Sequence, residues 1–283
     1  MTVQLKILKQ HAIFDGTLSF CSHFSAVCHC PMNFSIYVPQ QASQTPLPVL
    51  YFLAGLTCTE ENFMAKAGAQ RYAAELGLIL VAPDTSPRNT GIPGEGADWD
   101  FGAGAGFYVD ATESPWNKHY RTYSYVVEEL PTLISEYFPA DVARQGIFGH
   151  SMGGHGALVC GLRNGDRYRS ISAFAPIAAP SQCPWGQKAL MGYLGADRTA
   201  WDLYDATAIV STLPADSRPI LIDQGMSDPF LSEQLRPELF VKACRATKRD
   251  LTYREHSHYD HSYYFIATFI EDHIQFHARH LNP

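Results

Sequence analysis

The sequence of 283 residues has no long hydrophobic run and no concentration of positive charge. Its longest strongly apolar stretches, such as LGLILVA at 76–82, are too short for a membrane-spanning helix, which needs about 20 apolar residues. No run of Lys and Arg exceeds two residues, and the formal net charge is −7. Because nucleic acids and anionic lipids both attract concentrated basic faces, we expect neither a nucleic-acid partner nor a membrane partner.

The sequence also lacks the signs of export. The first 16 residues, MTVQLKILKQHAIFDG, contain no continuous apolar segment and no small-residue cleavage site, so we expect no signal peptide. The seven cysteines are an odd number and their spacing is irregular, which favours reduced thiols over a disulfide framework. Together these features predict a cytoplasmic protein.

Two short motifs could suggest a bound metal or nucleotide, and neither is complete. Cys28-His29-Cys30 lies in an alternating stretch that should form a strand with the two sulfurs on one face, and no second ligand pair at zinc spacing follows. GAGAG at 102–106 neither follows a strand directly nor opens a helix, and no G-K-[ST] accompanies it. We therefore expect no metal site and no cofactor.

What the sequence does contain is a regular alternation of short apolar runs and amphipathic stretches. Hydrophobic residues make up 46% of the chain, and no internal repeat, low-complexity tract or linker interrupts it, so one domain over residues 1–283 is the simplest organisation. After about 40 residues of hairpin-like extended segments, the pattern predicts strands at 47–55, 78–84, 145–150, 170–176, 218–225 and 250–255. It predicts helices at 61–77, around 120–138 with a kink at Pro131, after residue 151, at about 231–246 and at about 262–279. This order indicates an α/β fold with a mostly parallel sheet covered on both faces.

Ser151 is the candidate nucleophile. Gly149-His150-Ser151-Met152-Gly153 fits the G-x-S-x-G pattern and lies between a predicted strand and a predicted helix, the context that this motif requires. Glycines allow the strand and the helix to approach closely, and the helix amino terminus favours developing negative charge. A tight packing turn without catalysis is the alternative that the five residues alone leave open.

A serine needs a base, and the base needs a carboxylate that orients it. Asp228 lies in a loop beyond the strand at 218–225, whereas its competitor Asp223 lies inside the strand pattern, so we favour Asp228. Three histidines follow the last strand: His256, His258 and His261. His261 stands directly before the final helix and is the favoured base, while Asp260 and Ser262 could cap that helix.

An oxyanion hole would complete the site with two backbone N–H groups. Met152, the residue after the nucleophile, would supply one, and Gly55 or Leu56 in FLAGLTCTEENF would supply the other. Cys58 lies close to that donor, either as a half-buried small residue or as a site thiol whose modification would block the cleft. The long glycine-rich loop at 84–110 could wall the cleft, and Trp185 could pack a lid or anchor its own segment.

These residues stand within longer blocks that resemble the S-formylglutathione hydrolase (esterase D) family of the α/β-hydrolase superfamily. The blocks are LAGLTCTEENF, DTSPR, WDFGAGAGFYVDAT, GHSMGGHGAL, API with CPWGQKA and GYLG, DQG with a following Asp, and YDHSYYFI, in order from about residue 50 to 270. The resemblance implies an α/β-hydrolase fold, a triad of Ser151, Asp228 and His261, and oxyanion donors at Leu56 and Met152.

The resemblance also implies cleavage of S-formylglutathione to glutathione and formate in formaldehyde detoxification, with activity on simple esters and no metal or organic cofactor. Members often form dimers, so a homodimer is the expected state. The run PRNTGIPGEG, His258 in SHYDHS and the MSDPF turn depart from the family pattern, and the first two bear on the preference for glutathione. A general carboxylesterase or an acyltransferase with the same triad is the alternative, and a non-catalytic binding protein on a hydrolase scaffold is a more distant one.

Overall fold

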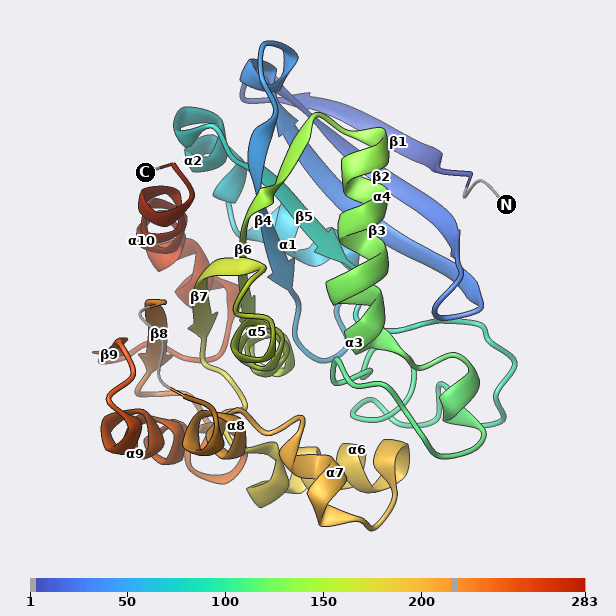
Figure 1. The fold of residues 1–283 in the computed structure, drawn as a ribbon, viewed down its shortest axis with the longest axis vertical. Helices are drawn as coiled ribbons and strands as arrows, with labels where there is room; N and C mark the ends of the chain where they lie inside the picture. Colours follow the sequence, from blue (N-terminus) through green and yellow to red (C-terminus); the bar gives the residue numbers. More distant parts are fainter. Residues whose placement is uncertain (1–3, 215–217, 283) are drawn as a thin grey trace.

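The computed structural model describes residues 4–214 and 218–282, so the outermost residues of the expected domain, 1–3 and 283, lie outside it. Its centre is a nine-stranded sheet in the order β1-β2-β3-β5-β4-β6-β7-β8-β9 (Figure 1). The strands are β1 (Lys6–Ile13), β2 (Gly16–Ser25), β3 (Cys30–Pro39), β4 (Leu47–Leu53), β5 (Ile79–Pro83), β6 (Ala140–His150), β7 (Tyr168–Phe174), β8 (Ile220–Gly225) and β9 (Leu251–His256).

The first strands pair antiparallel and the remainder pair parallel. β1, β2, β3 and β5 form the antiparallel side, and β5, β4, β6, β7, β8 and β9 follow as parallel neighbours. Every residue of β4, β5 and β8 is buried, which is why these segments read as continuous apolar runs rather than as an alternation. The expected mostly parallel sheet of an α/β-hydrolase fold is confirmed.

Helices cover both faces of the sheet. α1 (Glu60–Lys66), α2 (Ala69–Leu76) and α10 (Tyr263–Leu281) lie on one face, and α4 (Leu130–Tyr137), α5 (Met152–Arg163), α8 (Ala206–Thr212) and α9 (Pro237–Thr247) lie on the other (Figure 1). The remaining helical elements are η1 (Gln40–Ser43), η2 (Trp116–Lys118), α3 (Thr122–Ser124), η3 (Tyr125–Glu129), η4 (Pro180–Gln182), α6 (Pro184–Leu194), α7 (Arg198–Asp202) and η5 (Leu231–Leu235).

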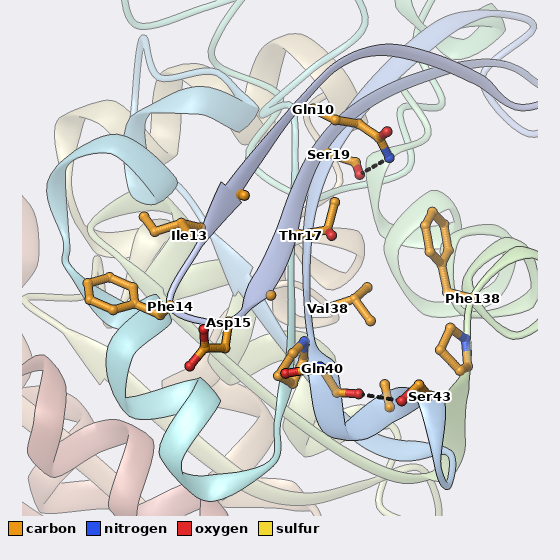
Figure 2. Close-up of a pocket in the computed structure, with 15 residues that line it drawn as sticks. Gln10, Ile13, Phe14, Asp15, Thr17, Ser19, Val38, Gln40, Ser43 and Phe138 are labelled. Carbon is orange, nitrogen blue, oxygen red and sulfur yellow. Dashed lines mark hydrogen bonds between the residues drawn. The ribbon is translucent and has the colours of Figure 1, made fainter.

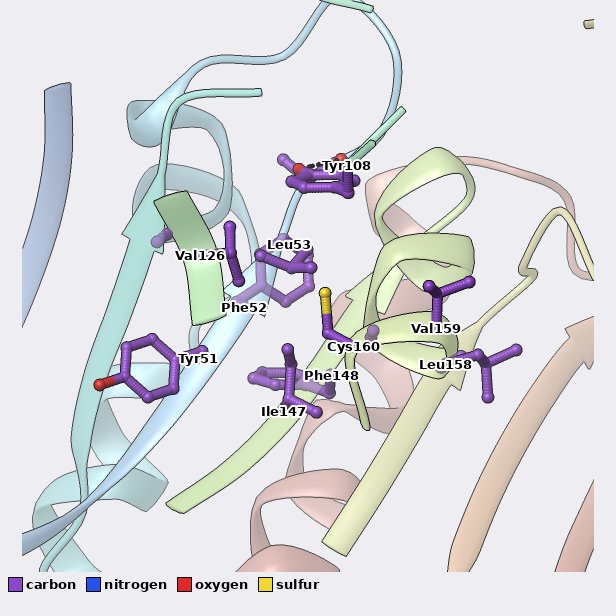
Figure 3. Packing of buried hydrophobic residues seen from close by; sticks show 14 of the residues in the cluster. Tyr51, Phe52, Leu53, Tyr108, Val126, Ile147, Phe148, Leu158, Val159 and Cys160 are labelled. Atoms are coloured by element: carbon purple, nitrogen blue, oxygen red, sulfur yellow. Dashed lines mark hydrogen bonds between the residues drawn. The ribbon is translucent and has the colours of Figure 1, made fainter. Parts of the chain in front are cut away.

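The core holds large side chains from the central strands and their covering helices (Figure 3). Phe52 of β4 stacks on Phe63 of α1 with ring centroids 3.8 Å apart, and both rings meet Phe148 of β6 edge-on. Burying one such side chain contributes roughly 1.5–3 kcal/mol. The strands that carry the candidate site are therefore fixed from both faces.

Two predicted helices differ from the structure. The helix expected at 61–77 is divided into α1 and α2 because Gly68 adopts a left-handed conformation, with φ of 69°. The helix expected around 120–138 is divided as well. Pro131 has no N–H to donate, and a π-helical turn, η3, precedes it, with the Leu130 N–H bonded to the Tyr125 carbonyl five residues earlier.

The Cys28-His29-Cys30 segment is not the continuous strand that the alternation predicted. Residues 26–29 form the turn between β2 and β3, His29 has a φ of 52°, and both thiols are buried. No group of three or more metal-binding side chains is found in the described part of the chain. Within the same residues, no helix has the length and apolar content to span a membrane.

A surface hollow of about 830 Å³ lies beside β1–β3, away from the carboxyl ends of the parallel strands (Figure 2). Side chains of Gln10, Thr17, Ser19 and Val38 line it together with Phe138. None of Ser151, Asp228 and His261 belongs to its lining, so this hollow is separate from the site considered next.

Candidate active site

Ser151 stands at the junction between β6 and α5 in a strained backbone conformation. Its φ of 58° and ψ of −119° lie in a region that residues with a side chain rarely occupy. The Ser151 N–H donates to the Phe174 carbonyl at 3.0 Å, and the Ser151 carbonyl accepts from the N–H groups of His155 and Ile177. These bonds hold the turn in place and present the hydroxyl at the carboxyl edge of the sheet.

The two glycines of the motif are required by close packing. A Cβ on Gly149 would lie 2.2 Å from the Gly153 carbonyl oxygen, and a Cβ on Gly153 would lie 1.9 Å from the Leu53 carbonyl oxygen. Both distances are shorter than any non-bonded contact. The strand, the turn and the first turn of α5 can therefore pack as they do only with glycine at these two positions.

Asp228 and His261 meet across the loops that follow β8 and β9. His261 Nδ1 lies 2.5 Å from Asp228 Oδ2, and the Asp228 side chain is fully buried. The Phe230 N–H donates to Asp228 Oδ1 at 2.9 Å and fixes the carboxylate. Since a carboxylate only accepts, Nδ1 carries the proton of the neutral imidazole, which leaves the Nε2 lone pair available as a base.

Two further rings confine the His261 imidazole. The His150 ring lies 4.4 Å away between centroids, and Phe230 meets His261 nearly perpendicularly at 5.1 Å. Burial, together with the neighbouring His261, holds the pKa of His150 well below its usual range, so His150 stays neutral. The His261 ring is thus oriented by one hydrogen bond and by contacts with two uncharged rings.

Ser151 Oγ forms no hydrogen bond with His261 or with any other residue among 4–214 and 218–282. Ser151 is nevertheless bonded in sequence to His150, whose ring contacts His261. In hydrolases the bond between nucleophile and base often tightens only in the substrate complex. Proton transfer from Ser151 to His261 would require this bond to form in the substrate complex.

Two backbone N–H groups lie beside Ser151. The Gly55 backbone is so near that a Cβ there would be 3.2 Å from Ser151 Cβ. A tight turn, in which the Cys58 N–H donates to the Gly55 carbonyl and the Thr57 N–H to the Gly104 carbonyl, leaves the Leu56 N–H without an acceptor among the described residues. Met152 is the first residue of α5, so its N–H has no acceptor within the helix.

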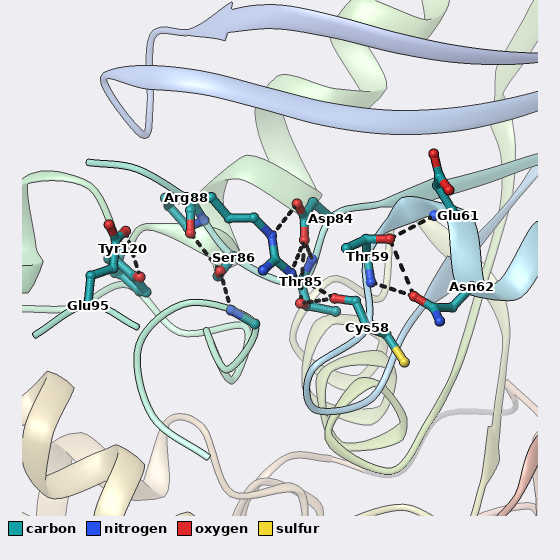
Figure 4. A network of polar contacts seen from close by, with 12 residues as sticks. Cys58, Thr59, Glu61, Asn62, Asp84, Thr85, Ser86, Arg88, Glu95 and Tyr120 are labelled. Carbon is teal, nitrogen blue, oxygen red and sulfur yellow. Dashed lines mark hydrogen bonds and ion pairs between the residues drawn. The ribbon is translucent and has the colours of Figure 1, made fainter. Parts of the chain in front are cut away.

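A polar network supports this turn from the long loop at 84–110 (Figure 4). The Cys58 carbonyl accepts from Thr85 Oγ1 at 2.6 Å and from Arg88 Nη2 at 3.0 Å. Arg88 in turn pairs with Asp84 through Nε at 2.8 Å and Nη2 at 3.0 Å. The loop that the sequence suggested as a cleft wall therefore holds the turn that carries Leu56.

Cys58 itself is half-buried and lies beside Tyr263. Burial raises the pKa of its thiol, and the opposing influences of Tyr263 and Lys66 do not offset that rise. The thiol is therefore mostly protonated at neutral pH.

Asp223, the competitor to Asp228, occupies a different environment. Its fully buried carboxylate accepts two bonds from Arg254, each at 2.6 Å, and lies 3.2 Å from His256 Nε2. Burial alone would raise its pKa, but His273 and Arg254 hold the pKa well below its usual range. Asp223 thus ties β8 to β9 and α10 and does not contact His261.

The other polar residues of the loop after β9 lie in environments different from that of His261. His256 pairs with Asp223, and His258 is exposed with a φ of 68°. Ser262 caps α10 by accepting from the Tyr264 N–H, and Asp260 accepts from both the N–H and the hydroxyl of Ser262. Of the three loop histidines, His261 alone contacts Asp228.

An aromatic series leads outward from the site. Phe230 contacts Trp185 at 4.8 Å between centroids, and Trp185 meets the exposed Trp99 perpendicularly at 5.4 Å. Sequence reasoning singled out Trp185 but missed Phe230 and the contact made by His150. Both lie within or beside the motifs already recognised, and position in a motif was the only available signal.

Comparisons with known proteins also indicate an esterase. A model of the family described as Putative esterase matches residues 25–276. An S-formylglutathione hydrolase of Rattus norvegicus is 54% identical over 281 residues, covering 99% of this chain and 100% of that protein. The chain belongs to the S-formylglutathione hydrolase family of esterases.

Further relatives in this family extend across kingdoms. An S-formylglutathione hydrolase of Arabidopsis thaliana is 55% identical over 271 residues, covering 95% of each chain. A solved structure from a structural and kinetic study of an S-formylglutathione hydrolase from Agrobacterium tumefaciens superimposes with a TM-score of 0.93. The two chains are 52% identical, with 97% of this chain and 99% of that one covered. The protein is therefore a hydrolase with an α/β-hydrolase-type fold.

Proposed function

We propose that the protein hydrolyses S-formylglutathione to glutathione and formate, with Ser151 as nucleophile, His261 as general base and acid, and Asp228 as the carboxylate that orients His261. The observation that carries the roles is the 2.5 Å contact between His261 and Asp228 beside the strained turn at Ser151. The names of the relatives supply the substrate.

The first step is acyl transfer to the enzyme. His261 Nε2 takes the proton of Ser151 as Oγ attacks the formyl carbon, and the developing oxyanion accepts from the N–H groups of Leu56 and Met152. The carbon–sulfur bond then breaks and glutathione leaves with the proton from His261. A thiol, with a pKa of about 8.5, leaves more readily than an alkoxide.

The second step releases formate. Water gives a proton to His261 as it attacks the formyl-Ser151 ester, and collapse of the tetrahedral intermediate returns that proton to Ser151 Oγ. Asp228 keeps the His261 Nδ1 proton in place and stabilises the imidazolium in both steps. Neither step requires a redox change.

Two finer proposals concern the state of the protein. All described strands belong to one sheet, which supports a single domain. The homodimer is proposed from the family resemblance. All seven cysteines are free, which supports a reducing, cytoplasmic location. Gel filtration with light scattering would test the dimer.

The decisive experiment compares hydrolysis of S-formylglutathione with that of 4-nitrophenyl acetate by the wild type and by Ser151→Ala. We expect a strong preference for the thioester and loss of both activities in the variant. If the variant is inactive but the ester is preferred, the substrate proposal fails and a general carboxylesterase replaces it. Full activity in Ser151→Ala would overturn the mechanism.

A further inference from the structure

Lys66 is an exposed cation at the end of α1, close to the candidate site. The helix begins directly after the turn that carries Leu56 and ends at Lys66, because Gly68 turns the chain away. Lys66 Nζ lies 5.5 Å from the centroid of the Tyr263 ring. Tyr263 is two residues beyond His261, so Lys66 sits where the turn after β4 meets the loop after β9.

Ring contacts connect this ammonium group to the catalytic machinery. The Tyr263 ring lies 6.1 Å from the His150 ring, which in turn contacts His261. Tyr263 also lies beside the Cys58 thiol, and the charge of Lys66 acts on that thiol. Lys66 therefore lies at the rim of the site, separated from His150 by the Tyr263 ring.

Three other basic side chains around this edge of the sheet are engaged by carboxylates. Arg88 pairs with Asp84, Lys188 bridges Asp98 and Asp100, and Arg254 pairs with Asp223 and Asp272. Lys66 has no ion pair with any of the residues that the structure describes. Its contact with the face of Tyr263 leaves its N–H donors available.

The glutathionyl group carries two carboxylates, and the protein that must bind it has a net charge of −7. At about 3.5 Å for each extended residue, these carboxylates lie on the order of 5 to 10 Å from the central sulfur. The two contacts that lead from Lys66 through Tyr263 to His150, of 5.5 Å and 6.1 Å, are steps of the same order. Resting on the proposed function, we propose that Lys66 binds a carboxylate of the glutathionyl leaving group and so determines specificity for a glutathione thioester.

A lysine in the last turn of a helix also interacts favourably with the helix dipole. That role would change stability alike for every substrate. Carboxylate binding instead changes the KM for the charged thioester and leaves a neutral ester unaffected. The two roles are therefore separable by substrate.

The test uses Lys66→Glu, Lys66→Gln and Lys66→Arg, with Lys242→Glu as the matched control. Lys242 is exposed on α9, at the β9 edge of the sheet, and its substitution changes the net charge equally. For S-formylglutathione we expect Lys66→Glu to raise KM at least about 10-fold with kcat within about 3-fold, because a charge-assisted hydrogen bond is replaced by repulsion. Lys66→Gln should be intermediate and Lys66→Arg close to wild type.

Hydrolysis of 4-nitrophenyl acetate should change by less than about 2-fold in all of these variants. Glutathione should inhibit that reaction in the wild type, more weakly in Lys66→Glu and unchanged in Lys242→Glu. An unaltered KM in Lys66→Glu, or an equal rise in Lys242→Glu, would overturn the assignment. If the wild type fails to hydrolyse S-formylglutathione, the proposed function fails, and inhibition by glutathione alone decides the role of Lys66.

Discussion

The backbone of Gly55 packs directly against Ser151, so that a methyl group at Gly55 would stand 3.2 Å from Ser151 Cβ and 3.3 Å from the His150 carbonyl oxygen. This contact joins the turn after β4 to the turn after β6. The next residue, Leu56, provides the proposed oxyanion donor. The position of that N–H group relative to Ser151 Oγ therefore depends on the absence of a side chain at Gly55.

Gly55→Ala should lower kcat while leaving the fold intact. The added methyl group would lie closer to Ser151 and His150 than ordinary van der Waals contact allows. The two turns must therefore separate by a few tenths of an ångström, and the Leu56 N–H moves with them. Loss of one oxyanion donor typically costs about 100- to 1000-fold in rate, and partial displacement should cost about 10-fold or more. Steady-state kinetics on S-formylglutathione would measure the loss.

Gly96→Ala is the matched control for this substitution. No atom lies within 4 Å of a Cβ at Gly96, although the residue belongs to the long loop near the site. We expect unchanged kcat and an unchanged melting temperature. Equal activity of Gly55→Ala and Gly96→Ala would show that the turn after β4 does not position a catalytic donor.

Asp228→Asn and Asp223→Asn should affect different properties. A neutral amide in place of the Asp228 carboxylate could not stabilise the imidazolium of His261 and would favour the wrong tautomer, so kcat should fall on the order of 10⁴-fold with little change in stability. Asp223→Asn would remove the buried negative charge that pairs with Arg254. This should cost on the order of 3 kcal/mol of folding free energy, while kcat per folded molecule changes little. Urea unfolding and active-site-normalised kinetics would separate the two. A catalytic defect in Asp223→Asn at unchanged stability would contradict this division.

The positions of Ser151, Asp228 and His261 could be predicted because parallel strands end at a common edge. Once β6, β8 and β9 are recognised as strands, the loops that follow them must lie together, and the order of a nucleophile, an acid and a base narrows the choice. The competition between Asp223 and Asp228 also follows from this rule, because a residue inside a buried strand faces a covering helix rather than the edge.

The contacts of His150 and Phe230 with His261 could not be predicted in the same way. They depend on the directions of side chains from three different loops, which no local periodicity records. The division of the helix at 61–77 was equally hidden, since Gly68 is only one of many glycines and its left-handed conformation is set by the packing of α1 and α2. The strand pattern is local, whereas these features are tertiary.

Stability should fall in mild acid because of His155. Burial lowers the pKa of this histidine from 6.5 to about 4. Between these values the unfolded chain binds a proton that the folded protein does not, so stability present above pH 6.5 is lost as the pH falls toward 4. His155 Nε2 donates to the Phe107 carbonyl at 2.9 Å, a bond that the amide of a glutamine could retain.

His155→Gln should therefore reduce the pH dependence of unfolding. Between about pH 7.5 and pH 5 the wild type should lose about 2 kcal/mol more than the variant, since one pKa unit corresponds to about 1.4 kcal/mol. Urea denaturation at several pH values would measure this difference. His11→Gln, at an exposed position on β1, is the control and should follow the wild type. Identical slopes for His155→Gln and the wild type would show that His155 does not carry this effect.

Alkylation should inactivate the enzyme slowly near neutral pH and faster as the pH rises, through Cys58. This is the one partly exposed thiol among seven free cysteines, and its raised pKa keeps it protonated near neutrality. A carbamidomethyl group there would crowd the turn that carries Leu56. Iodoacetamide treatment followed by mass spectrometry should find Cys58 modified first, in step with lost activity. Cys58→Ser should stay active and resist inactivation, because the thiol takes no part in the proposed mechanism. Inactivation of Cys58→Ser at the wild-type rate would place the sensitive group elsewhere.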